Sequence, residues 1–318
     1  MSSKVIFFEP VFKEKIWGGD KLQKLYQDAP KGRIGEAWLF SAHQNGHSLV
    51  TNGEFKGKSL EELWANHREL FGHMPGEKFP LLIKIIDAGD DLSVQVHPDD
   101  SYAKTHENGE LGKTECWYVL DCSEKSEIIY GINAKNQEEL NEMIDQGQWK
   151  RLLRSVPIKP GDFIYVPSGT VHALKKGALI LEVQQNSDTT YRLYDYDRKD
   201  DEGNLRELHI EKSKDVVSLP FVNNQTQPIV ENLKDGTKST LIKSEHFTVE
   251  KYVINGKCKL KNNQFFTLVN VVGGRGDLQV EDEVYTLSQG DFFMLSALAE
   301  DYSFKGQLDI IESHVEFP

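Results

Sequence analysis

The chain contains 318 residues, of which 38% are hydrophobic and 27% charged, a composition typical of a folded globular protein rather than a disordered or fibrous one. Its 50 acidic residues outnumber its 37 basic residues, and the net charge of −13 argues against general binding to nucleic acid or to an anionic membrane. No apolar run approaches the ~20 residues that cross a bilayer, and the quickly charged start does not resemble a secretory signal. The three cysteines, Cys116, Cys122 and Cys258, lack zinc-ribbon spacing, so we expect free thiols in a reducing cytoplasm.

Helical signals are confined to two segments. The first spans about residues 59–71, where Ser59 is a candidate N-cap and Glu62, three residues later, completes a capping box. The second spans about residues 134–153, where apolar residues recur near the helical period. We expect one helix in each segment.

Most of the remaining chain favours short strands. Apolar and polar residues alternate in segments 92–97, 117–120, 127–130, 162–166 and 179–184. Gly, Pro and Asp residues punctuate these segments, a pattern typical of a β-sandwich or β-barrel. We therefore predict a mainly β fold.

The chain also carries a weak internal repeat. Residues 161–167 (GDFIYVP) align with residues 290–296 (GDFFMLS), and each copy is a Gly-Asp turn that leads into an apolar strand. A polar, turn-rich stretch from about Leu219 to Gly236 lies between the copies and is a predicted linker. We predict two similar β-barrels, in residues 1–220 and 221–318.

Candidate metal ligands gather in the first half. Gln95 and His97 are two residues apart on a predicted strand, so both side chains point to one face. Glu115 opens a later apolar strand, and the strand after Gly161 ends in a Pro/Gly turn that presents His172. Two imidazoles, a carboxylate and an amide oxygen suit a borderline divalent ion such as Zn²⁺ and leave room for water or a substrate. A single histidine is more often structural, but this ordered set favours a metal site.

These motifs resemble those of known families. Residues 161–172 resemble the second motif of the cupin barrel. Gln95-Val-His97 followed by Glu115 resembles the first, with Gln where many cupins have His. More specifically, the chain is similar to type I mannose-6-phosphate isomerase in its short bacterial form. The segments that carry this likeness are 81–88, 92–98, 112–121, 166–173 and 190–195.

The resemblance covers most of residues 5–210 and implies a fold and a cofactor. The fold would be mainly β, with two cupin-like jelly-roll barrels and a few helices. One Zn²⁺ per chain would be held by the residues that match the family's ligands, which are Gln95, His97, Glu115 and His172. In the second half, Asp301 takes the place of His172 and no Gln-x-His motif precedes it. We therefore expect the metal site in the first barrel only.

The resemblance also implies a reaction, the interconversion of mannose 6-phosphate and fructose 6-phosphate. A proton must leave C2 and return at C1 through an enediol. A divalent ion can stabilise the charge that develops on oxygen, and a base must carry the proton. The expected partner is thus a small sugar phosphate, and the oligomeric state is not predicted.

Three residues are candidates for catalysis. Lys113 lies two residues before Glu115, so on a shared strand both would face the cleft, and the family match supports a role. Glu182 lies within an apolar strand, where a carboxylate is costly to bury unless it is paired or used. Arg192 is assigned from the family, where the matching arginine lies in the active site, and it could face either the enediolate or the phosphate.

Two further residues, Trp17 and Glu36, lie in stretches that flank the substrate cleft in the family, and we predict that they bind substrate. Three other functions remain open at this point. Two histidines and one carboxylate also describe an iron-dependent oxygenase, although Gln95 would crowd such a site. A cupin scaffold can serve as a non-catalytic sugar-phosphate sensor, and a different hexose phosphate could be the substrate.

Overall fold

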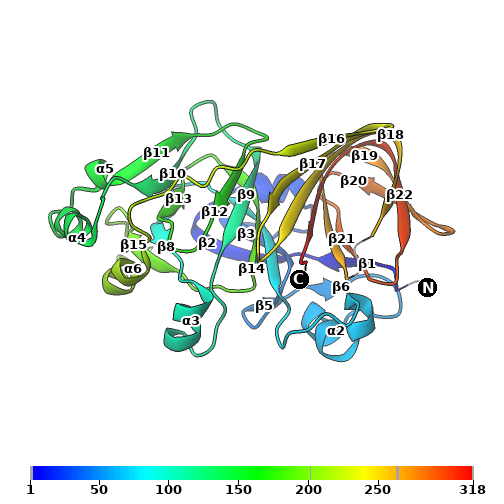
Figure 1. Cartoon of the computed structure of the whole chain (residues 1–318), viewed down its shortest axis with the longest axis horizontal. Helices are drawn as coiled ribbons and strands as arrows, with labels where there is room; N and C mark the ends of the chain where they lie inside the picture. The colour runs from blue at the N-terminus through cyan, green and yellow to red at the C-terminus, as the bar shows by residue number, and fades with distance from the viewer. Residues whose placement is uncertain (1–2, 201, 263–264, 317–318) are drawn as a thin grey trace.

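The computed structural model describes residues 3–200, 202–262 and 265–316. Within these ranges the chain is mainly β, as the sequence predicts, and three sheets contain most of the strands (Figure 1). No helix in the described ranges has both the length and the apolar character needed to span a membrane.

A six-stranded antiparallel sheet lies in the middle of the molecule (Figure 1). In order across the sheet its strands are β12 (Phe163–Val166), β9 (Glu115–Asp121), β14 (Leu179–Gln185), β7 (Leu81–Asp87), β3 (Ile34–Phe40) and β2 (Val11–Gly19). A five-stranded sheet packs against it and consists of β11 (Leu153–Pro157), β10 (Glu127–Ile132), β13 (His172–Leu174), β8 (Val94–Val96) and β15 (Tyr191–Tyr194).

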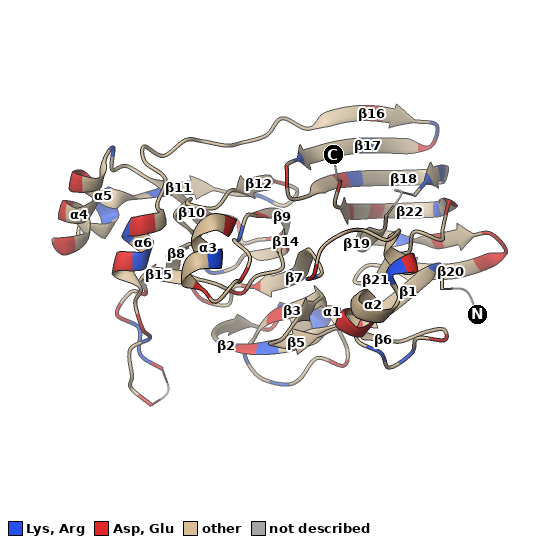
Figure 2. Ribbon diagram, turned by 60° about the horizontal axis from the view of Figure 1, so that its bottom comes forward, with Lys and Arg blue, Asp and Glu red and all other residues tan. Residues whose placement is uncertain are grey.

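The third sheet has nine strands and combines both ends of the chain. Its order is β16 (Ile229–Leu233), β17 (Gly236–Lys243), β18 (Thr248–Lys261), β22 (Asp301–His314), β19 (Thr267–Val280), β21 (Phe292–Leu295), β1 (Val5–Glu9) and β6 (Leu49–Val50), with β20 (Glu283–Ser288) paired to β19. The strands β4 (Ala42–His43) and β5 (Gly46–His47) form a separate hairpin. Both ribbon views place β1 beside β21 (Figures 1 and 2), so an N-terminal strand completes the sheet of the C-terminal half.

The helices are short and lie outside the sheets, where Figure 2 shows many of the charged residues. They are α1 (Lys21–Leu25), α2 (Leu60–Asn66), α3 (Asp100–His106), α4 (Gln137–Asp145), α5 (Trp149–Leu152) and α6 (Ile210–Val216), with a 3₁₀ turn η1 (Arg68–Phe71). The capping box of Ser59 and Glu62 begins α2 as predicted.

Both predicted helices are wrong in extent, because each is divided into two. Residues 59–71 form α2 and η1, since His67 leaves the helical conformation. Residues 134–153 contain α4 and α5, which Gly147 separates in a left-handed conformation at φ 62°. The predicted linker is also wrong in its second part, because residues 229–233 form β16 and pair with β17. The domain boundary near residue 220 stays a prediction.

The six-stranded sheet is covered on both faces. One face packs on the nine-stranded sheet through a cluster that includes Ile83, Ile85, Cys116, Leu181, Val183, Phe266, Leu268 and Met294. The other face packs on the five-stranded sheet through Ile86, Val119, Ile180, Ile128 and Leu174. Because side chains alternate along a strand, Glu182 lies on the same face as Ile180, toward the five-stranded sheet.

The internal repeat extends well beyond the seven aligned residues. Asp162 and Asp291 each accept a hydrogen bond from the backbone N–H three residues earlier, and the glycine before each has a positive φ. The strand order β12-β9-β14-β7-β3-β2 corresponds to β21-β19-β22-β18-β17-β16, with antiparallel pairing throughout both sets. The two halves therefore contain equivalent sheets, while closure of each into a jelly-roll barrel stays a prediction.

The shared register makes a specific comparison possible. In the first sheet Trp117, Glu182 and Lys84 lie opposite one another on β9, β14 and β7. In the second sheet Glu312 lies opposite Glu250 in the place of the Glu182–Lys84 pair. A carboxyl group thus replaces the buried ammonium group. Burial and the facing Glu250 raise the pKa of Glu312 to about 8, although the hydroxyl of Tyr302 donates to it and Lys238 attracts its charge.

This buried carboxyl pair predicts a pH-dependent stability. The pKa of Glu312 is higher in the folded chain than the ordinary 4.5. The contribution of Glu312 to the stability of the fold is therefore complete below about pH 4.5 and is lost as the pH rises through about 8. The neighbouring titratable groups are Glu250, Tyr252, Tyr302, Lys238 and His314. The variant Glu312→Gln cannot ionise and keeps an acceptor for Tyr302. At pH 9 we expect its free energy of unfolding to exceed that of the parent by about 2–5 kcal/mol.

Urea unfolding between pH 5 and pH 9 measures this difference. The exposed Glu124→Gln is the control and should leave the pH dependence unchanged. A Glu312→Gln protein that loses stability at pH 9 as the parent does would contradict the assignment.

Candidate active site and metal centre

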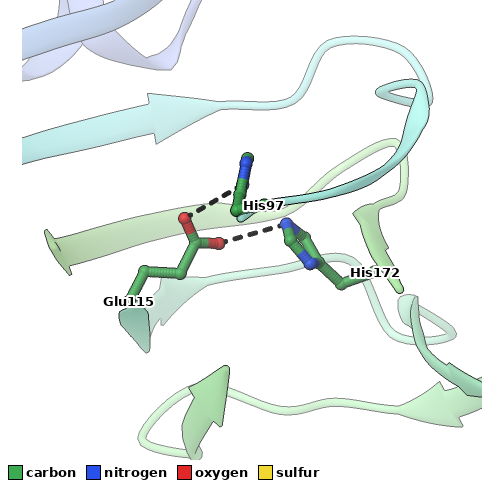
Figure 3. Close-up of side chains that lie close together, drawn as sticks. All are labelled: His97, Glu115 and His172. Carbon is green, nitrogen blue, oxygen red and sulfur yellow. Dashed lines mark ion pairs between the residues drawn. The ribbon is translucent and has the colours of Figure 1, made fainter. Parts of the chain in front are cut away.

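Three strands bring the predicted metal ligands together. His97 follows directly after β8, Glu115 begins β9, and His172 begins β13. Because β13 pairs with β8, His172 lies opposite Gln95. Figure 3 shows the carboxylate of Glu115 pointing between the two imidazole rings. The ligand atoms of His97, Glu115 and His172 lie within 4.8 Å of one another, and no other group of this kind is found among the described residues.

The hydrogen bonds of the two imidazole rings determine which ring nitrogen carries the proton. Nδ1 of His97 is 2.9 Å from the carbonyl oxygen of Thr189, and Nδ1 of His172 is 2.8 Å from that of Thr170. A carbonyl oxygen only accepts, so each Nδ1–H donates and each Nε2 faces the carboxylate. The Nε2–Oε distances to Glu115 are 3.4 Å for His97 and 3.3 Å for His172.

The protonation of these groups favours a bound cation. Burial lowers the pKa of His97 to about 3 and lowers that of His172 as well, so both rings are neutral near pH 7 and direct Nε2 lone pairs at the carboxylate. Nε2 of His97 and both carboxylate oxygens of Glu115 are buried without a hydrogen-bond partner. Lone pairs that converge in this way repel one another unless a cation lies between them, so the residues fit a metal ion.

Gln95 lies at the edge of this centre. Its amide nitrogen is 3.4 Å from Nε2 of His172. A half-turn of the amide exchanges its nitrogen and oxygen, and the oxygen would then face the centre as a ligand. The position is therefore compatible with the predicted fourth ligand, which stays a prediction.

A line of alternating charges extends from the metal centre along the inner face of the six-stranded sheet. Lys113 Nζ is 3.2 Å from Glu115 and 3.9 Å from Glu182. Lys84 Nζ is 3.0 Å from Glu182 and 3.7 Å from Glu36. All five side chains are buried. The structure thus joins Lys113, Glu182 and Glu36 to the ligand set, although Lys113 precedes β9 instead of lying within it.

Sequence reasoning missed Lys84. Its signal was present, because it is the one charged residue in the apolar run from Leu81 to Ile86. An ammonium group at the centre of a sheet covered on both faces requires an anionic partner. The partners are Glu36 and Glu182, and neither can be identified from the sequence without the strand register.

The pKa values follow from these contacts. Burial and the carboxylate of Glu115 raise the pKa of Glu182, and Lys84 and Lys113 only partly offset them. Burial alone would raise the pKa of Glu115, but the ammonium group of Lys113, 3.2 Å away, is the largest of the causes that hold it well below its usual range. Glu36 has a pKa of about 2, since Lys84, Lys15 and the indole N–H of Trp38 outweigh its burial.

The two remaining predicted residues, Arg192 and Trp17, lie on the strands β15 and β2. Arg192 on β15 is opposite Gln95, and its guanidinium donates to Ser93 Oγ at 3.3 Å and to the carbonyl oxygen of Glu207 at 2.7 Å. Trp17 is buried in the apolar cluster between the six- and five-stranded sheets. Their roles toward substrate stay predictions.

The comparisons with known proteins agree with this site. A family model described as the catalytic domain of type I phosphomannose isomerase matches residues 6–132, and one described as the cupin domain of mannose-6-phosphate isomerase matches residues 237–315. Mannose-6-phosphate isomerase ManA of Bacillus subtilis is 52% identical over 99% of this chain and 100% of the relative. The chain belongs to the type I mannose-6-phosphate isomerase family. The family resemblance read from the motifs is therefore confirmed.

Two further relatives support the family assignment. Mannose-6-phosphate isomerase of Streptococcus mutans is 51% identical over 97% of this chain and 98% of the relative. The crystal structure of mannose 6-phosphate isomerase from Bacillus subtilis superposes with a TM-score of 0.96 at 50% identity, over 98% of this chain and 100% of that one.

The metal centre predicts the behaviour of His172→Ala. We expect the purified variant to bind Zn²⁺ at least about 100-fold more weakly, because the imidazole ring supplies a ligand atom. The variant should keep its fold, because β13 pairs with β8 and β10 through backbone atoms. Zinc titration and circular dichroism measure the two properties. His246→Ala, remote from the centre in sequence and with its ring beside Glu245, is the control and should retain the metal. Full zinc affinity in His172→Ala would show that His172 is not a ligand.

Proposed function

We propose that this chain is a zinc-dependent mannose-6-phosphate isomerase that interconverts mannose 6-phosphate and fructose 6-phosphate by proton transfer through an enediol. The family assignment supports the reaction. One observation carries the mechanism. The buried oxygen Oε1 of Glu182 lies between the ammonium groups of Lys84 and Lys113, in the line of charges that leads to Glu115.

The residues that would hold the zinc ion are Gln95, His97, Glu115 and His172. Their mixed nitrogen and oxygen donors suit Zn²⁺, and three side chains plus an amide leave room for a substrate oxygen. When bound, the ion would polarise the substrate carbonyl and stabilise negative charge on oxygen. We propose one ion per chain, in the first half only, since Thr267 takes the register position of Glu115 in the second half.

Glu182 is the proposed base. Its raised pKa makes the carboxylate a stronger proton acceptor than an ordinary glutamate, and its burial keeps bulk water from competing. It would take the proton from C2 of the open-chain sugar and return it to C1. Lys84 and Lys113 hold the carboxylate in place and balance its charge before the transfer.

Lys113 and Arg192 are the proposed contacts for developing negative charge. Lys113 is positioned by Glu115 and Glu182, so its ammonium group can donate to a sugar oxygen beside the base. Arg192 would contact the enediolate or the phosphate, and the chain's net charge of −13 makes such a cation valuable for an anionic substrate. Trp17 and Glu36 are proposed to border the substrate, Glu36 through its contact with Lys84.

Cys116, Cys122 and Cys258 are all free thiols. They support the proposal that the enzyme works in a reducing cytoplasm.

Isomerisation in D₂O tests the reaction. A base that holds the abstracted proton can exchange it with solvent, so mannose 6-phosphate converted by the zinc-loaded enzyme should give fructose 6-phosphate with deuterium at C1, measured by NMR. The incorporation should be partial because the base is buried. The rate should not depend on O₂, and a strong chelator should abolish it until Zn²⁺ is restored.

Two outcomes would contradict this proposal. A rate that requires O₂ would favour the oxygenase. Absence of turnover with any hexose phosphate, in a folded and metal-loaded protein, would favour a sugar-phosphate sensor.

A further inference from the structure

The indole of Trp117 contacts the proposed base directly. Trp117 lies opposite Glu182 on the neighbouring strand β9, and only 2% of its surface is exposed. Its Nε1–H donates to Oε2 of Glu182 at 2.9 Å. The hydrogen bond is buried, so no water competes for either atom.

This contact distinguishes the two oxygens of one carboxylate. Oε2 is held by the indole, whereas Oε1 forms an ion pair with Lys84, at 3.0 Å from its Nζ, and lies 3.9 Å from Lys113 Nζ. Rotation about the last bond of a glutamate is soft, so two ammonium groups alone would hold the carboxylate plane poorly. A directional N–H at Oε2 fixes the plane of the carboxylate, so that Oε1 stays directed toward the two ammonium groups.

We propose that Trp117 is a positioning residue that holds Oε2 of Glu182, so that Oε1 is the oxygen that exchanges the substrate proton. This inference rests on the proposed function of Glu182. It extends that function by naming the reacting atom and the group that orients it. A base misplaced by even 1 Å can lower turnover about 100-fold, so a hydrogen bond of this kind matters for rate more than for affinity.

Trp117 also has a structural role that the test must separate. Its ring belongs to the apolar cluster between the sheets and lies edge-on to His172, with centroids 5.3 Å apart. Truncation would therefore disturb a metal ligand as well as the base. The informative change removes the N–H and keeps the bicyclic ring.

The experiment replaces Trp117 with β-(3-benzothienyl)alanine, in which sulfur takes the place of the N–H, and compares it with Trp117→Phe in the zinc-loaded enzyme. We expect the benzothienyl variant to have a kcat lower by about 10–100-fold, with KM for mannose 6-phosphate within about 3-fold and zinc content unchanged. Trp64→Phe is the control, since Trp64 is also buried and donates to the carbonyl oxygen of Glu77. It should lower stability and leave kcat unchanged.

Glu182→Gln and the double variant separate this inference from the proposed function. Glu182→Gln should lower kcat by about 10²–10⁴-fold, and adding the benzothienyl group should lower it no further, because both changes remove one function. If Glu182→Gln retains turnover, the proposed base is wrong. If Glu182→Gln loses turnover but the benzothienyl enzyme has the wild-type kcat, or if the two losses multiply, Trp117 does not act through Glu182 and the inference is overturned.

Discussion

The carboxylate of Glu115 imposes the constraint on which the rest of this site depends. It is fully buried, it faces two neutral imidazoles, and neither of its oxygens accepts a hydrogen bond. An isolated carboxylate in such surroundings would be strongly destabilising. Lys113 balances part of its charge, and Lys113 in turn contacts Glu182, which contacts Lys84. Each buried charge therefore requires the next, and the inner face of the six-stranded sheet has a line of paired charges beside its apolar residues.

The equivalent sheet in the second half of the chain has two carboxyl groups where the first half pairs a carboxylate with an ammonium group. Glu312 occupies the register place of Glu182, but Glu250 stands where Lys84 would be. Burial and the facing Glu250 raise the pKa of Glu312 to about 8. The hydroxyls of Tyr252 and Tyr302 donate to Glu250 and Glu312, and Lys238 pairs with Glu250 at 2.8 Å. The fold is compatible with both arrangements, and individual side chains decide which of them each half has.

The sequence predicted the mainly β fold, the repeat and the grouping of His97, Glu115 and His172, because period-two alternation and turn residues are local signals. Other features depend on partners that are distant along the chain. Lys84 was missed since its meaning comes from Glu36 and Glu182 on neighbouring strands. The pairing of β1 with β21 has no local signal. The two predicted helices were too long, because His67 leaves the helical conformation and Gly147 adopts a left-handed one.

Anomalous diffraction at the zinc edge, from crystals of the zinc-loaded protein, tests the central claim most directly. Our account predicts one anomalous peak per chain, coordinated by His97, Glu115 and His172, with the oxygen of Gln95 turned toward it. It predicts none beside Glu250 and Glu312, since these carboxyl groups face no histidine ligand in the described part of the chain and Lys238 already pairs with Glu250 at 2.8 Å. A peak at the second carboxyl pair, or a fully loaded chain whose zinc lies away from Glu115, would contradict it.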